Sequence, residues 1–221
     1  MTALVRYQAA LLIRSQRWLP PVLLYGVIMA IGISSGQPLL DSLAFAAAGM
    51  LPVAAWLVRV CVTNEPPAAR ACAAAAAGPG RVHLSSVLTA LLAAGALGAA
   101  GVLVVAVISD AHTADRRHVV PLGPAVTAGL LAVLVSALLG LAVGALTNPP
   151  VLRRAGWAIP VSGLSALLVL VIGGSPANAA VSGLVSGSQT GTVGLPLLPL
   201  CLAAVAAAAA TAVACALGSR R

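Results

Sequence analysis

The side chains best suited to chemistry gather in one short polar stretch, DAHTADRRH, at residues 110–118. Its carboxylates and imidazoles, both of them competent zinc ligands, are Asp110, His112, Asp115 and His118. Arg116 and Arg117 stand in the same stretch and would repel a cation. A metal site is therefore one interpretation of this stretch, and a solvated loop is the interpretation that we favour.

Residues for catalysis are otherwise missing. All twelve basic residues are arginine, so the chain lacks the lysine that a phosphate-binding G-x-x-x-x-G-K-S/T loop requires. Serine proteolysis inside a membrane needs a histidine at depth, whereas the three histidines stand in polar stretches or at the end of an apolar run. The four cysteines, which form no C-x-x-C pair and indicate no disulfide or zinc site, are Cys61, Cys72, Cys201 and Cys215. We expect no enzyme activity and no cofactor. ATP hydrolysis by a phosphate-binding loop of that type would take place on another polypeptide.

The composition predicts an integral membrane protein. Hydrophobic residues make up 61% of the 221 residues and charged residues only 7%, with a mean hydropathy of +1.08. A soluble domain has about 25% charged residues, so this chain cannot cover itself with a water-compatible surface. The net charge of +8 comes without a basic patch or stacking aromatic residues, which argues against nucleic-acid binding.

Six largely apolar segments approach the roughly 20 residues that a membrane span requires. They are residues 19–36, 42–62, 84–109, 125–147, 156–175 and 195–218. No acid, lysine or histidine stands in the middle of a span, which argues against a proton-coupled carrier or an ion channel. The predicted fold is an all-α integral membrane protein, with residues 1–221 as one transmembrane domain.

Residues 1–18, which precede the first span, predict an interfacial helix. At 100° per residue, Arg6, Arg14 and Arg17 fall in one sector with the leucines opposite. The pattern is imperfect, because Gln8 shares the leucine side. A basic face opposite an apolar one is typical of a helix that lies in the membrane surface.

The arginines also predict the orientation. With the N-terminus in the cytoplasm, six spans place ten arginines inside and only Arg116 and Arg117 outside, as the positive-inside rule favours. The ten are Arg6, Arg14, Arg17, Arg59, Arg70, Arg81, Arg153, Arg154, Arg220 and Arg221. We expect a multi-pass protein of the cell (inner or plasma) membrane with both termini in the cytoplasm. Arg59, near the end of the second span, can extend to the membrane surface.

Residues 63–83 then form a cytoplasmic segment between the second and third spans. Pro66 and Pro67 stop one helix, and the alanine-rich run that follows has strong helix propensity until Gly78-Pro79-Gly80 ends it. The polar residues around this short helix are Glu65, Arg70, Arg81 and His83. A short helix held between two spans is a candidate docking element for a soluble partner.

Two further patterns concern packing. Gly32 and Gly36, and likewise Gly140 and Gly144, make G-x-x-x-G pairs that let helices approach closely, either within the chain or between two copies. Residues 176–194 are rich in Gly and Ser and lie outside in the predicted topology. We expect there a loop with a short re-entrant or interfacial helix, protected by neighbouring protein.

Taken together, these features resemble the membrane permease subunits of ABC exporters, in the type-two export class. The resemblance covers the basic N-terminal helix, the six spans, the short helix between spans two and three, and the Gly/Ser-rich outer segment. Two segments are also similar to actinobacterial proteins of this kind, namely WLVRVCVTNEPPAARACAAAAAGPGRVHLSS and GGSPANAAVSGLVSGSQTGTV. The short outer loops depart from members of the family that carry large external domains.

The resemblance implies a function and partners. The helix between spans two and three would contact a separate ABC ATPase subunit, with Glu65, Arg70, Arg81 and His83 as its polar members. Two ATPase subunits and a second permease subunit, identical or different, would complete an exporter in the lipid bilayer. The N-terminal helix would be the family's interfacial elbow, and residues 176–194 its outer re-entrant segment. The alternative is a membrane scaffold that does not transport and holds an assembly partner through the same loop.

Overall fold

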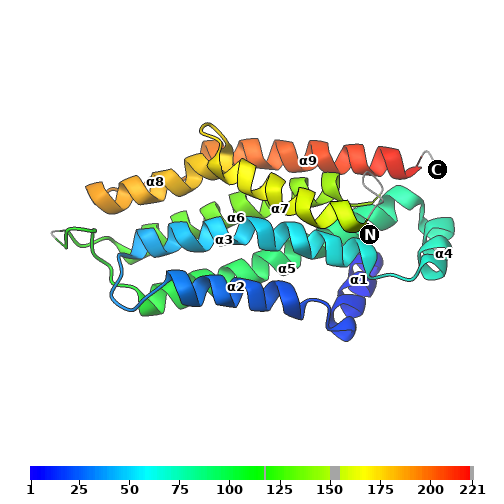
Figure 1. Ribbon diagram of the computed structural model, residues 1–221, viewed down its shortest axis with the longest axis horizontal. Coiled ribbons are helices and arrows are strands. Elements are labelled where there is room, and N and C mark those ends of the chain that lie inside the picture. The colour runs from blue at the N-terminus through cyan, green and yellow to red at the C-terminus, as the bar shows by residue number, and fades with distance from the viewer. Residues whose placement is uncertain (117, 150–154, 220–221) are drawn as a thin grey trace.

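A computed structural model describes residues 1–116, 118–149 and 155–219, and over these residues the chain is all-α, without a sheet (Figure 1). The described helices are α1 (Thr2–Ser15), α2 (Leu19–Gly32), α3 (Leu39–Thr63), α4 (Pro67–Ala77), α5 (Pro79–Ile108), α6 (Leu122–Thr147), α7 (Ala155–Val171), α8 (Pro176–Thr190) and α9 (Leu197–Ser219). Five arginines of the orientation argument lie outside the described residues, namely Arg117, Arg153, Arg154, Arg220 and Arg221.

The α3–α6 pair forms the centre of the bundle. A Cβ on Gly144 of α6 would lie 2.7 Å from the Val58 Cβ and 2.9 Å from the Ala55 carbonyl oxygen of α3, and one on Gly140 would meet the backbone of Leu51. Only glycine permits so close an approach of two helices. The Gly140–Gly144 pair therefore serves packing within the chain, which decides between the two interpretations that the sequence left open.

The other G-x-x-x-G pair is split between two roles. A Cβ on Gly32 would overlap the ring of Phe45 on α3, so this glycine also serves packing within the chain. Gly36 lies beyond the end of α2 with φ +81°, in the left-handed region that glycine adopts readily. It therefore belongs to the turn between α2 and α3, where the Gln37 N–H donates to the Ser34 carbonyl oxygen at 3.3 Å.

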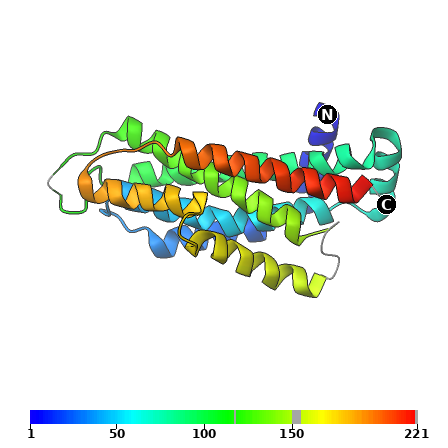
Figure 2. The ribbon, with the colours of Figure 1, turned by 90° about the horizontal axis from the view of Figure 1, so that it is seen from above.

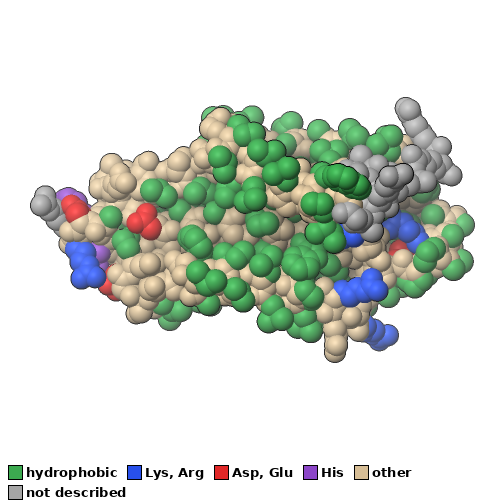
Figure 3. Space-filling model, in the orientation of Figure 1, with side chains coloured by type: hydrophobic (Ala, Val, Ile, Leu, Met, Phe, Trp, Pro, Cys, Tyr) green, Lys and Arg blue, Asp and Glu red, His purple; other side chains and the backbone are tan. Residues whose placement is uncertain are grey.

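The remaining long helices cover the central pair and show apolar surface outward. The α5 and α9 helices flank α6, and α2 packs on α3 (Figures 1 and 2). Large apolar side chains on their outer faces are exposed, among them Ile31, Leu92, Leu103, Val107 and Val205. In the space-filling view, charged side chains lie toward the two ends and apolar ones cover the length between them (Figure 3). An exposed apolar belt of this kind is suited to lipid.

Helix length and hydropathy identify a multi-pass membrane protein. Among the described residues, four helices are long and apolar enough to cross a membrane: α3, α5, α6 and α9. The α7 and α8 helices qualify together as a fifth, bent by 49° at their junction. The α2 helix is apolar but has only 14 residues, about 21 Å of helix against a hydrocarbon core of about 30 Å. Helix length and composition thus support four or five of the six spans that the sequence predicts.

Several boundaries differ from the predicted ones. The α2 helix ends at Gly32 instead of residue 36, and α7 ends at Val171 instead of residue 175. Conversely, α5 begins at Pro79 instead of residue 84, because proline at the first helical position fits the start of a helix. Arg81 and His83 therefore belong to the beginning of the long helix α5 and not to the short segment that precedes it.

For residues 176–194 the sequence predicts an outer segment with a short re-entrant or interfacial helix, protected by neighbouring protein. The structure forms the helix α8 there and packs it along α3 and α6, where it buries Ala177, Ala180 and Leu184. A tight turn joins α7 to α8, so that the two helices follow one path from the α4 end of the bundle to the opposite end (Figure 2). The small residues of α8 allow this close helix packing.

Candidate functional site

The candidate site is the polar end of the bundle, where α1 and α4 lie beyond the ends of the long helices (Figure 1). Pro66 has an extended backbone and Pro67 occupies the first turn of α4, so α3 cannot continue into α4. At the other end of α4, Gly78 has φ +88°, in the region that glycine adopts readily, and Pro79 follows as the first residue of α5. The chain thereby reverses between two long helices through one short helix.

A buried hydrogen bond ties α1 to this reversal. The Gln8 side-chain amide donates to the Glu65 carboxylate, with 3.1 Å between Nε2 and Oε2, and both side chains are buried. The second carboxylate oxygen, Oε1, has no hydrogen-bond partner among the described residues. A buried carboxylate is costly unless it is hydrogen-bonded, so this contact fixes where α1 rests against the α3–α4 junction.

Arg70 links three helices from its position on α4. Its Nη1 donates to the Val62 carbonyl oxygen at 2.9 Å, in the last turn of α3. Cations are favourable there, because the last carbonyls of a helix have no partner within it. Its Nη2 lies 3.4 Å from Nδ1 of His83, which is buried at the beginning of α5. The position of α4 is therefore coupled to the ends of both long helices.

The structure brings the four predicted contact residues to one end but gives them different surroundings. Glu65 and His83 are buried and Arg70 is half-buried, and the contacts of all three are with neighbouring helices. Arg81 is the only one of the four that is exposed. Gln8, which completes the cluster, was not among the predicted site residues. Its position on the leucine side of α1 was the signal that could have found it.

The outward face of α4 consists of small side chains. Residues at helical spacing on this face are exposed, namely Ala68, Ala71, Cys72, Ala75 and Ala76. The opposite face, which carries Arg70, is half-buried against α5. No residue of α4 is fully buried. The helix therefore offers a smooth surface of methyl and thiol groups at the tip of the molecule.

The predicted faces of α1 agree with the structure. Arg6 and Arg14 are exposed, while Leu12 is buried against the bundle. The helix ends at Ser15 instead of residue 18, so the exposed Arg17 lies beyond it. Tyr7 lies on the exposed side near Glu65, and partial desolvation of the ring, followed by the charge of that carboxylate, raises the pKa of Tyr7 above its ordinary value.

The opposite end of the bundle contains the loop in which we considered a metal site. The described part of the chain has no group of three or more His, Cys, Asp or Glu side chains placed to hold a metal ion. Thr113 instead organises the loop: its hydroxyl donates to Asp115 at 2.6 Å and accepts from the His118 backbone N–H at 3.1 Å. A bond from the Ala114 N–H to the Ser188 carbonyl oxygen, 3.0 Å long, fastens the loop to α8. Arg117 lies outside the described residues.

Fold and site together define a class: a multi-pass, all-α membrane protein that holds a short helix beyond one end of its bundle. Comparison of the chain with protein-family models, with curated proteins and with solved structures finds no match. The case for a function therefore depends on the geometry of the site and on the sequence pattern.

Proposed function

We propose that this chain is the membrane subunit of an ATP-driven ABC exporter of the type-two class, and that α4 docks on a separate ATPase subunit. The observation that carries the proposal is the exposed alanine face of α4. A helix without a fully buried residue is poorly stabilised by its own contacts, because most helices in proteins depend on packing for their stability. A partner with a groove that accepts the helix would supply the missing contacts.

The topology of the bundle supports this proposal. Taking α2 as a short first span and α7 with α8 as one broken span, the chain makes six crossings, the others being α3, α5, α6 and α9. The α1 and α4 ends then lie on the same side of the membrane (Figure 1). Six of the described arginines belong to that side and only Arg116 to the other, so the positive-inside rule makes it the cytoplasmic side, where ATP is available.

The contacts at the site provide a mechanical link from the docking helix to the spans. A push on α4 reaches the end of α3 through Arg70 and Val62, and reaches the beginning of α5 through His83. The Gln8–Glu65 bond transmits the same movement to α1. The chain itself would make and break no covalent bond. Its role is to form a pathway with a second permease subunit and to convert movement of the ATPase into opening of that pathway.

The experiment is co-purification of this chain with a co-expressed ABC ATPase subunit from the same organism. Ala71→Glu and Ala75→Glu place charges on the docking face and keep a good helix former in α4. We expect each variant to reduce ATPase capture at least tenfold. Ala10→Glu, at an exposed position on α1, is the matched control and should capture the ATPase as the wild type does. Undiminished capture by both α4 variants would refute the docking role.

Transport and scaffolding are separated by a second measurement on the same complexes. An exporter subunit couples docking to hydrolysis, so the wild-type chain in liposomes should change the ATPase rate and the α4 variants should abolish that change. A scaffold would hold the ATPase through α4 and leave its rate unaltered. Capture with no effect on hydrolysis would therefore favour the scaffold.

A further inference from the structure

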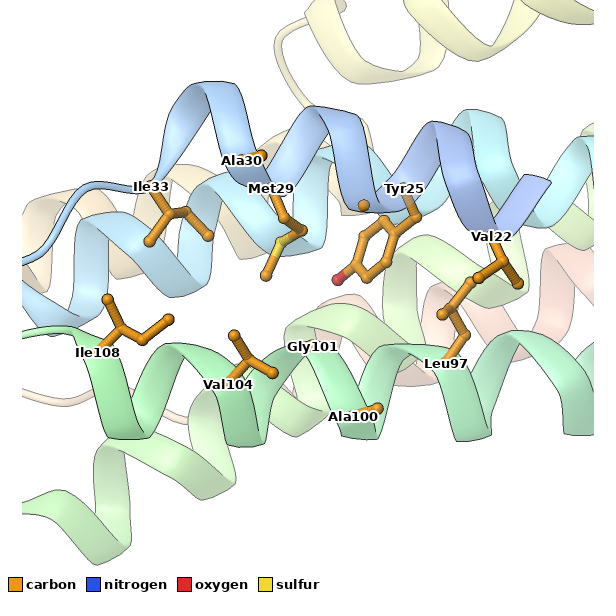
Figure 4. A pocket seen from close by; sticks show the side chains of 11 residues that line it. Val22, Tyr25, Met29, Ala30, Ile33, Leu97, Ala100, Gly101, Val104 and Ile108 are labelled. Carbon is orange, nitrogen blue, oxygen red and sulfur yellow. The ribbon is translucent and has the colours of Figure 1, made fainter. Parts of the chain in front are cut away.

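An apolar groove runs between α2 and α5 on the side of the bundle (Figure 4). Its cavity has a volume of about 390 Å³, with Tyr25, Met29 and Ile33 reaching in from α2 and Leu97, Val104 and Ile108 from α5. Small residues widen it, because Gly26 and Ala100 are exposed along its length. Val104 and Ile108 remain 49% and 42% exposed, so the groove opens on the outer surface of the molecule.

The groove continues toward α1. A second cavity of about 260 Å³ shares Val22 and Leu97 with the first and extends to Leu12, Ile13 and Trp18. The two cavities follow α5 from Ala93 to Ile108, which is 16 residues and about 22 Å of helix. The hydrocarbon part of one membrane leaflet is about 15 Å thick, half of a core of about 30 Å. The combined groove is therefore long enough for an acyl chain that enters from the α1 side.

The chemistry of the groove selects hydrocarbon. Tyr25 supplies the only side-chain hydroxyl among the residues that line the two cavities. That hydroxyl donates to the Ala46 carbonyl oxygen at 3.2 Å, inside the bundle. A Cβ on Gly101 would lie 2.5 Å from the hydroxyl oxygen of Tyr25. The tyrosine ring is therefore held between α3 and α5 and cannot turn outward freely. No polar ligand group would find a partner along the groove.

The α1 end of the groove carries positive charge. Trp18 lines the second cavity, and the exposed Arg17 precedes it in the chain. Arg14 is also exposed, one residue after Ile13, which lines the same cavity. Arg14 lies in the last turn of α1, and Arg17 follows the end of that helix, where its Nη1 donates to the Thr63 carbonyl oxygen at 3.5 Å. Glu65, the acidic side chain on this side, is buried and bonded to Gln8. Basic side chains at the level of lipid headgroups attract anionic lipids.

We propose that this groove binds one anionic phospholipid, with an acyl chain between α2 and α5 and its headgroup phosphate at Arg14 and Arg17. The site requires only that the bundle lies in a membrane, so it stands independently of the proposed transport function. Trp18 fits the same arrangement, because indole rings are favoured at the headgroup level. The lipid would fill the space beside α2 that the protein itself leaves open.

The test is native mass spectrometry of the full chain with added phosphatidylglycerol and phosphatidylcholine that have identical acyl chains. Wild type should retain one phosphatidylglycerol with at least tenfold preference. Arg14→Gln and Arg17→Gln should each lower that preference about fivefold, since one arginine near an anionic surface is worth about that factor, and leave phosphatidylcholine binding unchanged. Equal retention of the two lipids by the wild type would overturn the proposal.

A second pair of variants examines the acyl chain. Gly26→Leu places a bulky side chain in the groove from a position at which an added Cβ meets nothing within 4 Å. It should weaken both lipids at least tenfold. Gly95→Leu is the matched control on α5, equally unobstructed and outside the groove lining, and should bind both as the wild type does. If Gly26→Leu instead converts a dimer to a monomer with lipid retention unchanged, the groove is an interface between two copies and the lipid site is refuted.

Discussion

Single glycines decide how tightly the two central helices meet, and Gly144 is the clearest case. A Cβ there would stand 2.9 Å from the Ala55 carbonyl oxygen, which belongs to a helix backbone and cannot move aside by changing a rotamer. We expect Gly144→Ala to lower the free energy of unfolding by about 1–3 kcal/mol, the usual range for overpacking. Denaturation by SDS in mixed micelles would measure it.

The control for this prediction is Gly95→Ala on α5, where an added Cβ meets nothing within 4 Å. This substitution should leave stability unchanged or raise it by up to about 1 kcal/mol, because alanine is the better helix former. Equal losses at the two positions would show that loss of glycine as such, and not the contact with α3, governs stability.

Glu65 allows a residue-scale test of the contact between α1 and the α3–α4 junction. Glu65→Ala removes the acceptor and leaves the buried Gln8 amide without its partner. The expected loss is about 1–3 kcal/mol of unfolding free energy, with faster hydrogen exchange in α1. Glu65→Gln keeps a carbonyl oxygen in place and should retain most of the stability. Arg81→Ala, at an exposed position, should change it by less than about 0.5 kcal/mol.

At the scale of elements, the junction of α7 and α8 is held by Ser175 and by Asn178, whose side-chain amide donates to the Leu170 carbonyl oxygen at 3.1 Å. The Ser175 side chain accepts from the Asn178 backbone N–H at 3.0 Å, as an N-cap, and donates to the Val169 carbonyl oxygen of α7. We expect Ser175→Ala to cost about 1 kcal/mol and to speed hydrogen exchange in the first turn of α8. Ser182→Ala, on the exposed side of the same helix, should leave that exchange unchanged.

The sequence predicts an element when the interactions that form it lie close together in the chain. The start and end of α4 follow from Pro66, Pro67 and Gly78, whose backbone preferences act within a turn, and the structure places the helix where they predict. The pairing of Gln8 with Glu65 spans 57 positions in the chain, and no local pattern specifies it. The burial of Glu65 follows from this distant contact, so its position next to a turn does not predict its burial.

The sequence predicts a short re-entrant or interfacial helix within residues 176–194, but not the helices against which it packs. Its composition of Gly, Ala and Ser has weak apolar character, so hydropathy alone does not identify a span there. In the structure the same small side chains let α8 approach α3 closely, and Ala177 and Ala180 are buried there. Hydropathy records the side chains of one segment, whereas packing depends on the helix that receives it.

At the scale of the whole molecule, the placement in the membrane is tested with the four cysteines, which are all free. Cys72 on α4 and Cys201 on α9 are both exposed on the isolated protein, but Cys201 belongs to the apolar belt. With single-cysteine variants in sealed vesicles, a membrane-impermeant maleimide should label Cys72 from the cytoplasmic face only. Cys201 should react only after detergent removes the lipid, because lipid excludes both the reagent and the thiolate.

A cysteine introduced by His112→Cys, in the exposed loop at the opposite end, should react from the outer face only. Labelling of Cys72 and of this loop from the same face would contradict the topology, and with it the docking of α4 on a cytoplasmic ATPase.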